Sequence, residues 1–350
     1  MSESEKKTDL PGFEKRECRL RTVSAAMRAG GKKGIPEGVP FKGHMVRKRG
    51  KMDILEFLKV VFLGIVEGIT EWLPISSTGH MILVDEFVKL NVSESFWNMF
   101  LVVIQLGAVL AVVVLDFKKL WPFHKNDPQR ESNWNYISQN KKLAGVQRFA
   151  DKYVNMSKIV LWMKILVSCL PAIIIGLPFN DWIEAHLNNY WVVSVMLIVY
   201  GVLFIVIERY NKTREPRAVR LGEITFRDAL LIGVFQVLAI VPGTSRSGAT
   251  IVGGILIGMS RKLAAEYTFF LAIPVMFGAS LLKVFSFGLS FTGTEVAILL
   301  LGMVVAFGVS ILAIKFLMSY IKKHDFTVFG WYRIVLGILV LGYFLTIGRG

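Results

Sequence analysis

The chain has 350 residues, of which 53% are hydrophobic, and its formal net charge is +15 at pH 7. Its mean hydropathy of +0.53 is too high for an ordinary soluble domain, which excludes most soluble enzymes and binding modules. The basic excess lies in polar segments between apolar ones, where Lys and Arg determine membrane topology, so it does not indicate a nucleic-acid partner.

The N-terminal residues 1–51 differ in composition from the rest of the chain. They hold eight Lys and six Arg against six Asp and Glu, and no long apolar run follows before Val60, which argues against a signal peptide. We expect a disordered basic extension, outside a functional chain that starts at Met52. The two cysteines, Cys18 and Cys169, lack the spacing of a disulfide framework or a metal site.

Residues 52–350 are expected to form one membrane domain, built from two repeats at about 53–208 and about 222–350. Stretches of roughly 20 apolar residues can cross a bilayer of ~30 Å as a helix. Six such windows predict transmembrane helices, at 97–116, 159–177, 190–208, 262–283, 294–317 and 328–347.

The loops between these windows predict the orientation. Segments 117–158, 209–227 and 319–327 are basic, whereas 178–190 and 284–295 contain no Lys or Arg. Basic loops stay on the cytoplasmic side, so the three basic segments are expected inside and both ends of the 52–350 domain outside.

Two further apolar segments, 53–90 and 228–258, are interrupted by Pro, Ser and Gly. GIVEGITEWLPISSTGHMI (64–82) aligns with GVFQVLAIVPGTSRSGATI (233–251) at a constant offset of 169 residues. The predicted orientation puts them on opposite sides of the membrane, which is typical of inverted repeats whose broken helices meet near the midplane. The predicted fold is therefore an all-α polytopic membrane protein with an inverted-topology repeat, about six transmembrane helices and two re-entrant broken helix pairs. The alternative is two ordinary spans that contain Pro and Gly.

The second broken segment, PGTSRSGAT (242–250), has the composition of an anion site. Small residues such as Gly243 allow several backbone N–H groups to point into one concavity, and a following helix adds its positive end. Arg246 can bind phosphate oxygens with two parallel hydrogen bonds. Hydroxyls come from Ser245, Ser247 and Thr250. Alternatively, Arg246 pairs with a glutamate of the other repeat, and the two interpretations are compatible.

The first broken segment carries carboxylates where lipid-facing residues would be expected. Glu67 and Glu71 are four residues apart, so on a helix they share one face. Two such carboxylates suit a divalent cation or a coupled acid/base pair.

The same segment offers a nucleophile. Ser76, Ser77 and Thr78 supply hydroxyls, and His80 follows three residues after Ser77. A Ser–His pair is the minimal equipment for an activated nucleophile, although His80 could instead activate a water or protonate a leaving group. A plainer interpretation is that the hydroxyls cap the helix that follows Pro74. An anion cradle facing an acid/base cluster suits phosphoryl transfer on a lipid whose tail stays in the bilayer.

The motifs EGITEWLPISSTGH (67–80) and PGTSRSGATIVGG (242–254) closely resemble those of the bacterial undecaprenyl-diphosphate phosphatase family, also known as bacitracin-resistance proteins. The resemblance covers 52–350. It implies hydrolysis of undecaprenyl diphosphate to the monophosphate, which recycles the lipid carrier of peptidoglycan synthesis and gives bacitracin resistance. It also implies dependence on a divalent cation, Mg²⁺ or Ca²⁺, and a site open to the extracytoplasmic side of the bacterial cell membrane. The family's functional residues fall here on Glu67, Glu71, Ser77, His80, Ser245, Arg246 and Thr250.

A transporter is the main rival from another class, because inverted repeats with broken helices are common among secondary transporters. A structural membrane scaffold would leave the intramembrane Arg and Glu unexplained. The sequence leaves open whether the chain forms a homo-oligomer, whether it also flips the lipid, and whether Ser77 or a water attacks the phosphate.

Overall fold

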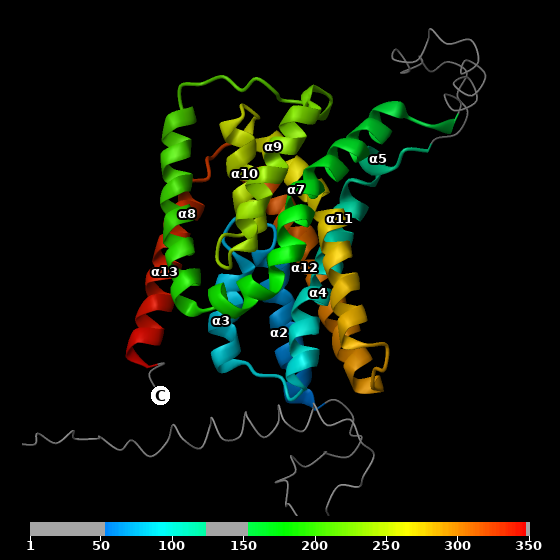
Figure 1. Cartoon of the computed structure of the whole chain (residues 1–350), viewed down its shortest axis with the longest axis vertical. Coiled ribbons are helices and arrows are strands. Elements are labelled where there is room, and N and C mark those ends of the chain that lie inside the picture. Colours follow the sequence, from blue (N-terminus) through cyan, green and yellow to red (C-terminus); the bar gives the residue numbers. More distant parts are fainter. Residues whose placement is uncertain (1–52, 124–152, 348–350) are drawn as a thin grey trace, which may run out of the picture. The chain divides into compact units, whose positions relative to one another are not determined.

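The computed structural model describes residues 53–123 and 153–347, and Figure 1 shows their arrangement. The expected extension 1–51 lies outside these ranges. The longer helices are α2 (Ile54–Thr70), α3 (Ser77–Phe87), α4 (Glu94–Leu115), α7 (Met156–Leu187), α8 (Tyr190–Asn211), α9 (Phe226–Val237), α10 (Arg246–Leu256), α11 (Arg261–Phe287), α12 (Gly293–Tyr320) and α13 (Thr327–Thr346). The shorter ones are α5 (Phe117–Leu120) and the 3-10 helices η1 (Leu221–Glu223) and η2 (Leu238–Ile240).

Six of the described helices are long and apolar enough to cross a membrane, and they match the six predicted windows. They are α4, the Met156–Phe179 part of α7, α8, α11, α12 and α13. Four of them begin at a polar residue whose side chain accepts a hydrogen bond from the first turn, namely Ser93, Asn189, Ser260 and Thr292. The prediction of an all-α polytopic membrane protein is confirmed.

Each of the two broken segments consists of two helices separated by a turn. The first is α2, a turn and α3, and the second is α9 with η2, a turn and α10. Ser76 and Ser245 precede α3 and α10 with φ of 72° and 71°, and their hydroxyls accept from the backbone N–H of Gly79 and Gly248 at 3.3 and 3.2 Å. The expected capping role of the hydroxyls is therefore present at Ser76, and the second turn repeats it.

The two segments also pack in matching ways. α2 packs against α12, and α9 packs against α7. A Cβ at Gly64 would come within 3.0 Å of the Gly302 carbonyl oxygen, and one at Gly233 within 2.5 Å of the Ser168 carbonyl oxygen. Close approach of helices at small residues is typical of packing in membranes. Figure 1 shows α2 and α3 toward one end of the bundle and α9 and α10 toward the other. The inverted symmetry of the whole repeats stays a prediction.

Both turns lie against buried helices. Every residue of α10 from Ser247 to Ile255 is buried, as expected for a helix surrounded by others. Trp72, in the first turn, is fully buried and packs edge-on against Phe269 of α11, with ring centroids 5.2 Å apart. The polar residues of the turns are therefore held inside protein, which is where irregular backbone is tolerated at membrane depth.

Candidate active site

Glu71 joins the two broken segments. Its Oε1 lies 3.1 Å from Arg246 Nη2, and its Oε2 accepts a hydrogen bond of 3.1 Å from the Ser77 hydroxyl. The side chains of Glu71 and Arg246 are only 7% and 12% exposed, so both charges are largely removed from solvent. The expected pairing of Arg246 with a glutamate of the other repeat is therefore present. A carboxylate in contact with a serine hydroxyl can accept its proton.

The second turn reinforces this contact. The Ser247 hydroxyl donates to the Glu71 carbonyl oxygen at 3.1 Å and lies 3.2 Å from the Ser245 hydroxyl. Arg246 Nη1 donates to the Thr268 carbonyl of α11 at 3.1 Å. The Thr250 hydroxyl donates to the Arg246 carbonyl at 2.9 Å and accepts from Thr268 at 2.9 Å, which holds α10 against α11. Arg246 is thus fixed from three directions.

Among the buried polar atoms without a partner in the described residues, two belong to predicted site residues. They are Nε of Arg246 and Oε1 of Glu67, and both are buried. Buried polar atoms are almost always hydrogen-bonded, so an unpartnered donor and an unpartnered acceptor indicate a place for a ligand. Glu67 is 1% exposed and lies one helical turn before Glu71. Oxygens of an anion suit the guanidinium nitrogen, and a proton or a cation suits the carboxylate.

Glu67 and Glu71 can hold a divalent cation only together with ligands from outside the protein. No group of three or more His, Cys, Asp or Glu side chains that could hold a metal occurs in 53–123 or 153–347. Mg²⁺, however, is usually bound by one or two carboxylates together with substrate phosphates and water, which two glutamates can supply. Glu67 keeps an unpartnered oxygen for this purpose, whereas both oxygens of Glu71 already accept hydrogen bonds.

His80 does not contact Ser77, because both of its ring nitrogens have other partners. Its Nδ1 is 2.7 Å from the Ser76 carbonyl oxygen, and its Nε2 is 2.7 Å from the hydroxyl of Tyr332 on α13. The hydrogen bond expected between Ser77 and His80 is not formed, because the Ser77 hydroxyl donates to Glu71 instead. Thr78 is exposed on the first turn of α3.

Arg333 on α13 is a residue that the sequence analysis missed. Its side chain is completely buried, and Nη1 donates to the Pro74 carbonyl at 3.2 Å. Its Nη2 donates to the carbonyls of Gly243 and Thr244, each at 2.8 Å. A planar guanidinium with five donors is suited to binding several acceptors at once, so one side chain ties the two turns together. An arginine inside an otherwise apolar span was a signal available in the sequence.

Gly243 adopts a backbone conformation that glycine favours, with φ of +89°. A Cβ there would come within 2.6 Å of the Val193 carbonyl oxygen of α8, so the turn rests directly on that helix. Its carbonyl is held by Arg333. The substrate-binding role expected for Gly243 stays a prediction.

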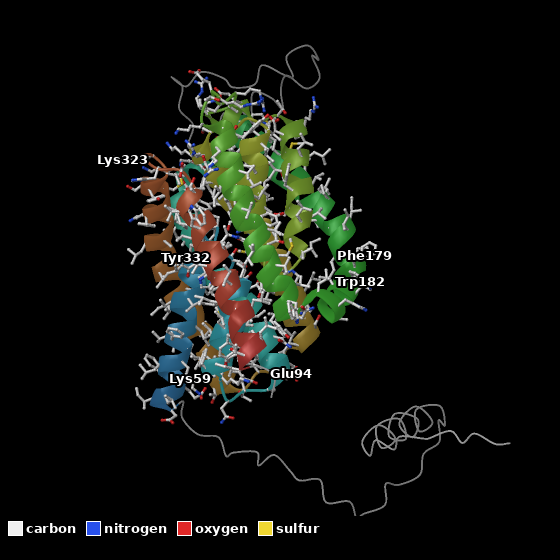
Figure 2. All side chains as sticks on the ribbon, turned by 90° about the vertical axis from the view of Figure 1, so that its left-hand side faces the viewer. Lys59, Glu94, Phe179, Trp182, Lys323 and Tyr332 are labelled. Carbon is white, nitrogen blue, oxygen red and sulfur yellow. The ribbon has the colours of Figure 1, made fainter. Side chains whose placement is uncertain are left out.

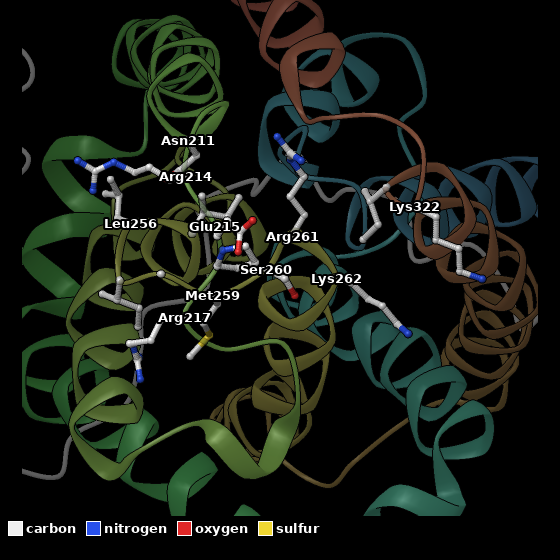
Figure 3. A pocket seen from close by; sticks show the side chains of 15 residues that line it. Asn211, Arg214, Glu215, Arg217, Leu256, Met259, Ser260, Arg261, Lys262 and Lys322 are labelled. Carbon is white, nitrogen blue, oxygen red and sulfur yellow. The ribbon is translucent and has the colours of Figure 1, made fainter.

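A cavity of about 550 Å³ opens at the other end of α10 (Figure 3). It lies one helix length from Arg246, since eleven residues of α10 span about 16 Å. Two of its arginines are neutralised, because Arg261 pairs with Glu208 and Arg217 with Asp228. The predicted site residues do not line this cavity, so it is separate from the Glu71–Arg246 cluster.

Comparison with known proteins gives one consistent result. The family profile of bacitracin resistance protein BacA matches residues 60–339. The chain is 59% identical over 297 residues to undecaprenyl-diphosphatase 1 of Clostridium acetobutylicum, covering 85% of this chain and 100% of that protein. It is 59% identical over 294 residues to undecaprenyl-diphosphatase of Desulfitobacterium hafniense and 57% identical over 291 residues to that of Enterococcus faecalis, each covering 98% of the relative and 84% or 83% of this chain. The chain therefore belongs to the bacitracin resistance protein BacA family.

Proposed function

We propose that the chain is a membrane phosphatase that hydrolyses undecaprenyl diphosphate to undecaprenyl phosphate and inorganic phosphate. The observation that carries the proposal is the contact of one buried carboxylate, Glu71, with Ser77 on one side and Arg246 on the other. The names of the relatives supply the substrate. Such a cluster holds a proton acceptor (Glu71), a nucleophile (Ser77) and a guanidinium that can bind phosphate (Arg246) in one place.

In the proposed reaction, the terminal phosphate enters beside Arg246. The guanidinium binds its oxygens, with the unpartnered Nε as the donor that no protein group occupies. The Ser77 oxygen attacks the terminal phosphorus while its proton passes to Glu71, and the bond from that phosphorus to the bridging oxygen breaks. The lipid monophosphate leaves with the bridging oxygen, which takes up the proton from Glu71. A water then hydrolyses the phosphoserine, returns Ser77 to its hydroxyl form and releases inorganic phosphate.

Direct attack by a water is the alternative to this covalent route. Glu71 or His80 would then accept the proton of that water, and Ser77 would only orient Glu71. The substrate side is proposed to be lined by the backbone at Gly243 and by five hydroxyls, those of Ser76, Thr78, Ser245, Ser247 and Thr250. Of these, Ser245 and Ser247 lie nearest to Arg246 in the chain and are the first to test.

A divalent cation, Mg²⁺ or Ca²⁺, is proposed as the cofactor. Glu67 and Glu71 would hold it, and when bound it would neutralise charge on the diphosphate oxygens. Glu67 has the unpartnered carboxylate oxygen that such an ion needs.

The proposed setting is the bacterial cell membrane, with the site open to the extracytoplasmic side. There the enzyme would recycle the lipid carrier of peptidoglycan synthesis and thereby give bacitracin resistance. The six membrane-crossing helices and the bacterial relatives support a multi-pass membrane location. The basic character of the loops 117–158 and 209–227 supports the orientation.

The proposal is tested by phosphate release from lipid diphosphates of several chain lengths. Detergent-purified protein is assayed with Mg²⁺, with Ca²⁺ and with a chelator, beside Arg246→Ala. We expect release that the chelator abolishes and that falls at least about a thousandfold in the variant, because one preorganised neutral donor contributes about 10²–10³ and the guanidinium of Arg246 is charged. Retained hydrolysis by Arg246→Ala would exclude the assigned phosphate site. A protein that moves lipid only in sealed vesicles and releases no phosphate would be a transporter.

A further inference from the structure

The hydrogen bonds of His80 determine which of its nitrogens carries a proton. Nδ1 lies 2.7 Å from the Ser76 carbonyl oxygen, which can only accept. Nδ1 is therefore the donor, and Nε2 of the neutral ring is the acceptor. The partner of Nε2 is the Tyr332 hydroxyl at 2.7 Å, which must donate.

Tyr332 also holds the plane of the imidazole. The two rings are stacked, with centroids 5.6 Å apart and an interplanar angle of 10°. The ring stack and the hydrogen bond to His80 both come from Tyr332 on α13. The next residue of α13, Arg333, donates to carbonyls of the two turns. Figure 2 shows Tyr332 between Lys323 and Lys59 along the long direction of the bundle, away from both polar ends. The tyrosine therefore meets His80 at the depth of the broken segments.

We propose that Tyr332 is a positioning residue of the phosphatase reaction, which fixes the orientation of His80 and supplies the hydrogen-bond donor to its Nε2. The proposal rests on the proposed function, and within it on the alternative route in which His80 accepts the proton of an attacking water. A histidine that exchanges protons works only in the correct tautomer, and a hydrogen bond to its other nitrogen usually sets that tautomer. Here the Ser76 carbonyl and the Tyr332 hydroxyl hold the two ring nitrogens between them.

The chain offers a conservative variant and a matched control. Tyr332→Phe keeps the ring that stacks on His80 and removes only the hydroxyl. Tyr343→Phe makes the same change on the same helix, where the ring packs against Phe87 and Phe344 and no hydrogen bond of the hydroxyl is found within the described residues. A difference between the two variants therefore reports on the contact with His80.

The test is a double-mutant cycle on purified protein, with wild-type hydrolysis measured first in the same assay. We expect Tyr332→Phe to lower kcat about tenfold with KM unchanged, the effect of losing one positioned hydrogen bond, while Tyr343→Phe stays at the wild-type value. In protein that already carries His80→Gln, adding Tyr332→Phe should not lower kcat further. Wild-type protein without hydrolysis would overturn the proposed function. Wild-type hydrolysis with an unchanged kcat for Tyr332→Phe, or an equal fall in the His80→Gln background, would overturn the role of Tyr332.

A spectroscopic measurement keeps the proposal testable where His80→Gln has too little activity for a cycle. Protein labelled with ¹⁵N in its histidine rings, with the His80 signals assigned by their absence in His80→Gln, should show the Nδ1–H tautomer. In Tyr332→Phe the Nε2 shift should move, because Nε2 loses its hydrogen-bond donor, while Nδ1 stays protonated against the Ser76 carbonyl, and in Tyr343→Phe neither shift should change. Signals of the Nε2–H tautomer in the wild-type protein would contradict the proposal.

Discussion

The two broken segments share a backbone and differ in chemistry. Ser76 and Ser245 occupy equivalent positions, have nearly the same positive φ and cap the following helix in the same way. The residues that follow them, Ser77 and Arg246, are equivalent as well, because they differ by the same offset of 169. Both bind the same carboxylate, Glu71, one at each oxygen. The near-symmetry of the backbone thus brings a hydroxyl and a guanidinium from matching positions onto one group.

This comparison separates what the turns need for folding from what they need for chemistry. The cap, the positive φ and the close packing at glycine recur in both copies, so they belong to the fold. Glu71 has no counterpart, since the equivalent residue in the second copy is Ile240. Functional differences should therefore follow the unmatched residues, and stability differences the matched ones.

Within this comparison of the two turns, the largest expected effect on the rate separates two serines that both contact Glu71. Ser77 donates to the carboxylate, whereas Ser247 donates to the backbone carbonyl. Ser77→Ala should lower kcat at least about a hundredfold, because it removes the proposed nucleophile, and Ser247→Ala less than about tenfold, because it removes one hydrogen bond. Both are measured by phosphate release at saturating substrate. Full turnover by Ser77→Ala would exclude Ser77 as nucleophile, and a phosphoryl-enzyme trapped on Ser77 would support the covalent route.

An effect on stability rather than on the rate is expected where one residue serves both turns. Arg333→Gln leaves the carbonyls of Pro74, Gly243 and Thr244 without their buried donor, so it should lower the stability of the folded protein by about 3 kcal/mol. Thermal unfolding in detergent measures this as a lower midpoint. Arg209→Gln, a change at an exposed position, is the control and should leave the midpoint unchanged. Equal midpoints for the two variants would show that the turns do not depend on Arg333.

Arg333 also marks the limit of prediction from the sequence. The six spans and the two broken segments were predictable because apolar length and Pro/Gly interruptions are local features. The pairing of Arg246 with a glutamate was foreseen as one alternative, since a buried arginine needs an anionic partner. The contacts from α13 depend on how segments between 89 and 259 residues apart in the chain pack together, and no spacing rule reports that. The sequence therefore suggested a Ser77–His80 pair, because the two residues are close in the chain. In the structure, Ser77 forms a hydrogen bond with Glu71, and His80 forms one with Tyr332.

The smallest effect tests whether the two caps are as alike as their geometry. Alanine at Ser76 or Ser245 removes the cap hydrogen bond and keeps a side chain at positive φ, so each change should cost about 1–2 kcal/mol of stability. Glycine also removes the hydrogen bond, but it adopts positive φ without strain, so each Ser→Gly variant should be more stable than its Ser→Ala counterpart by roughly 1 kcal/mol. The four variants are compared by thermal unfolding. If Ser→Gly is more stable than Ser→Ala at both positions, the two turns share one backbone conformation. The opposite order of stability at either position would show that the repeats have diverged in structure as well as in chemistry.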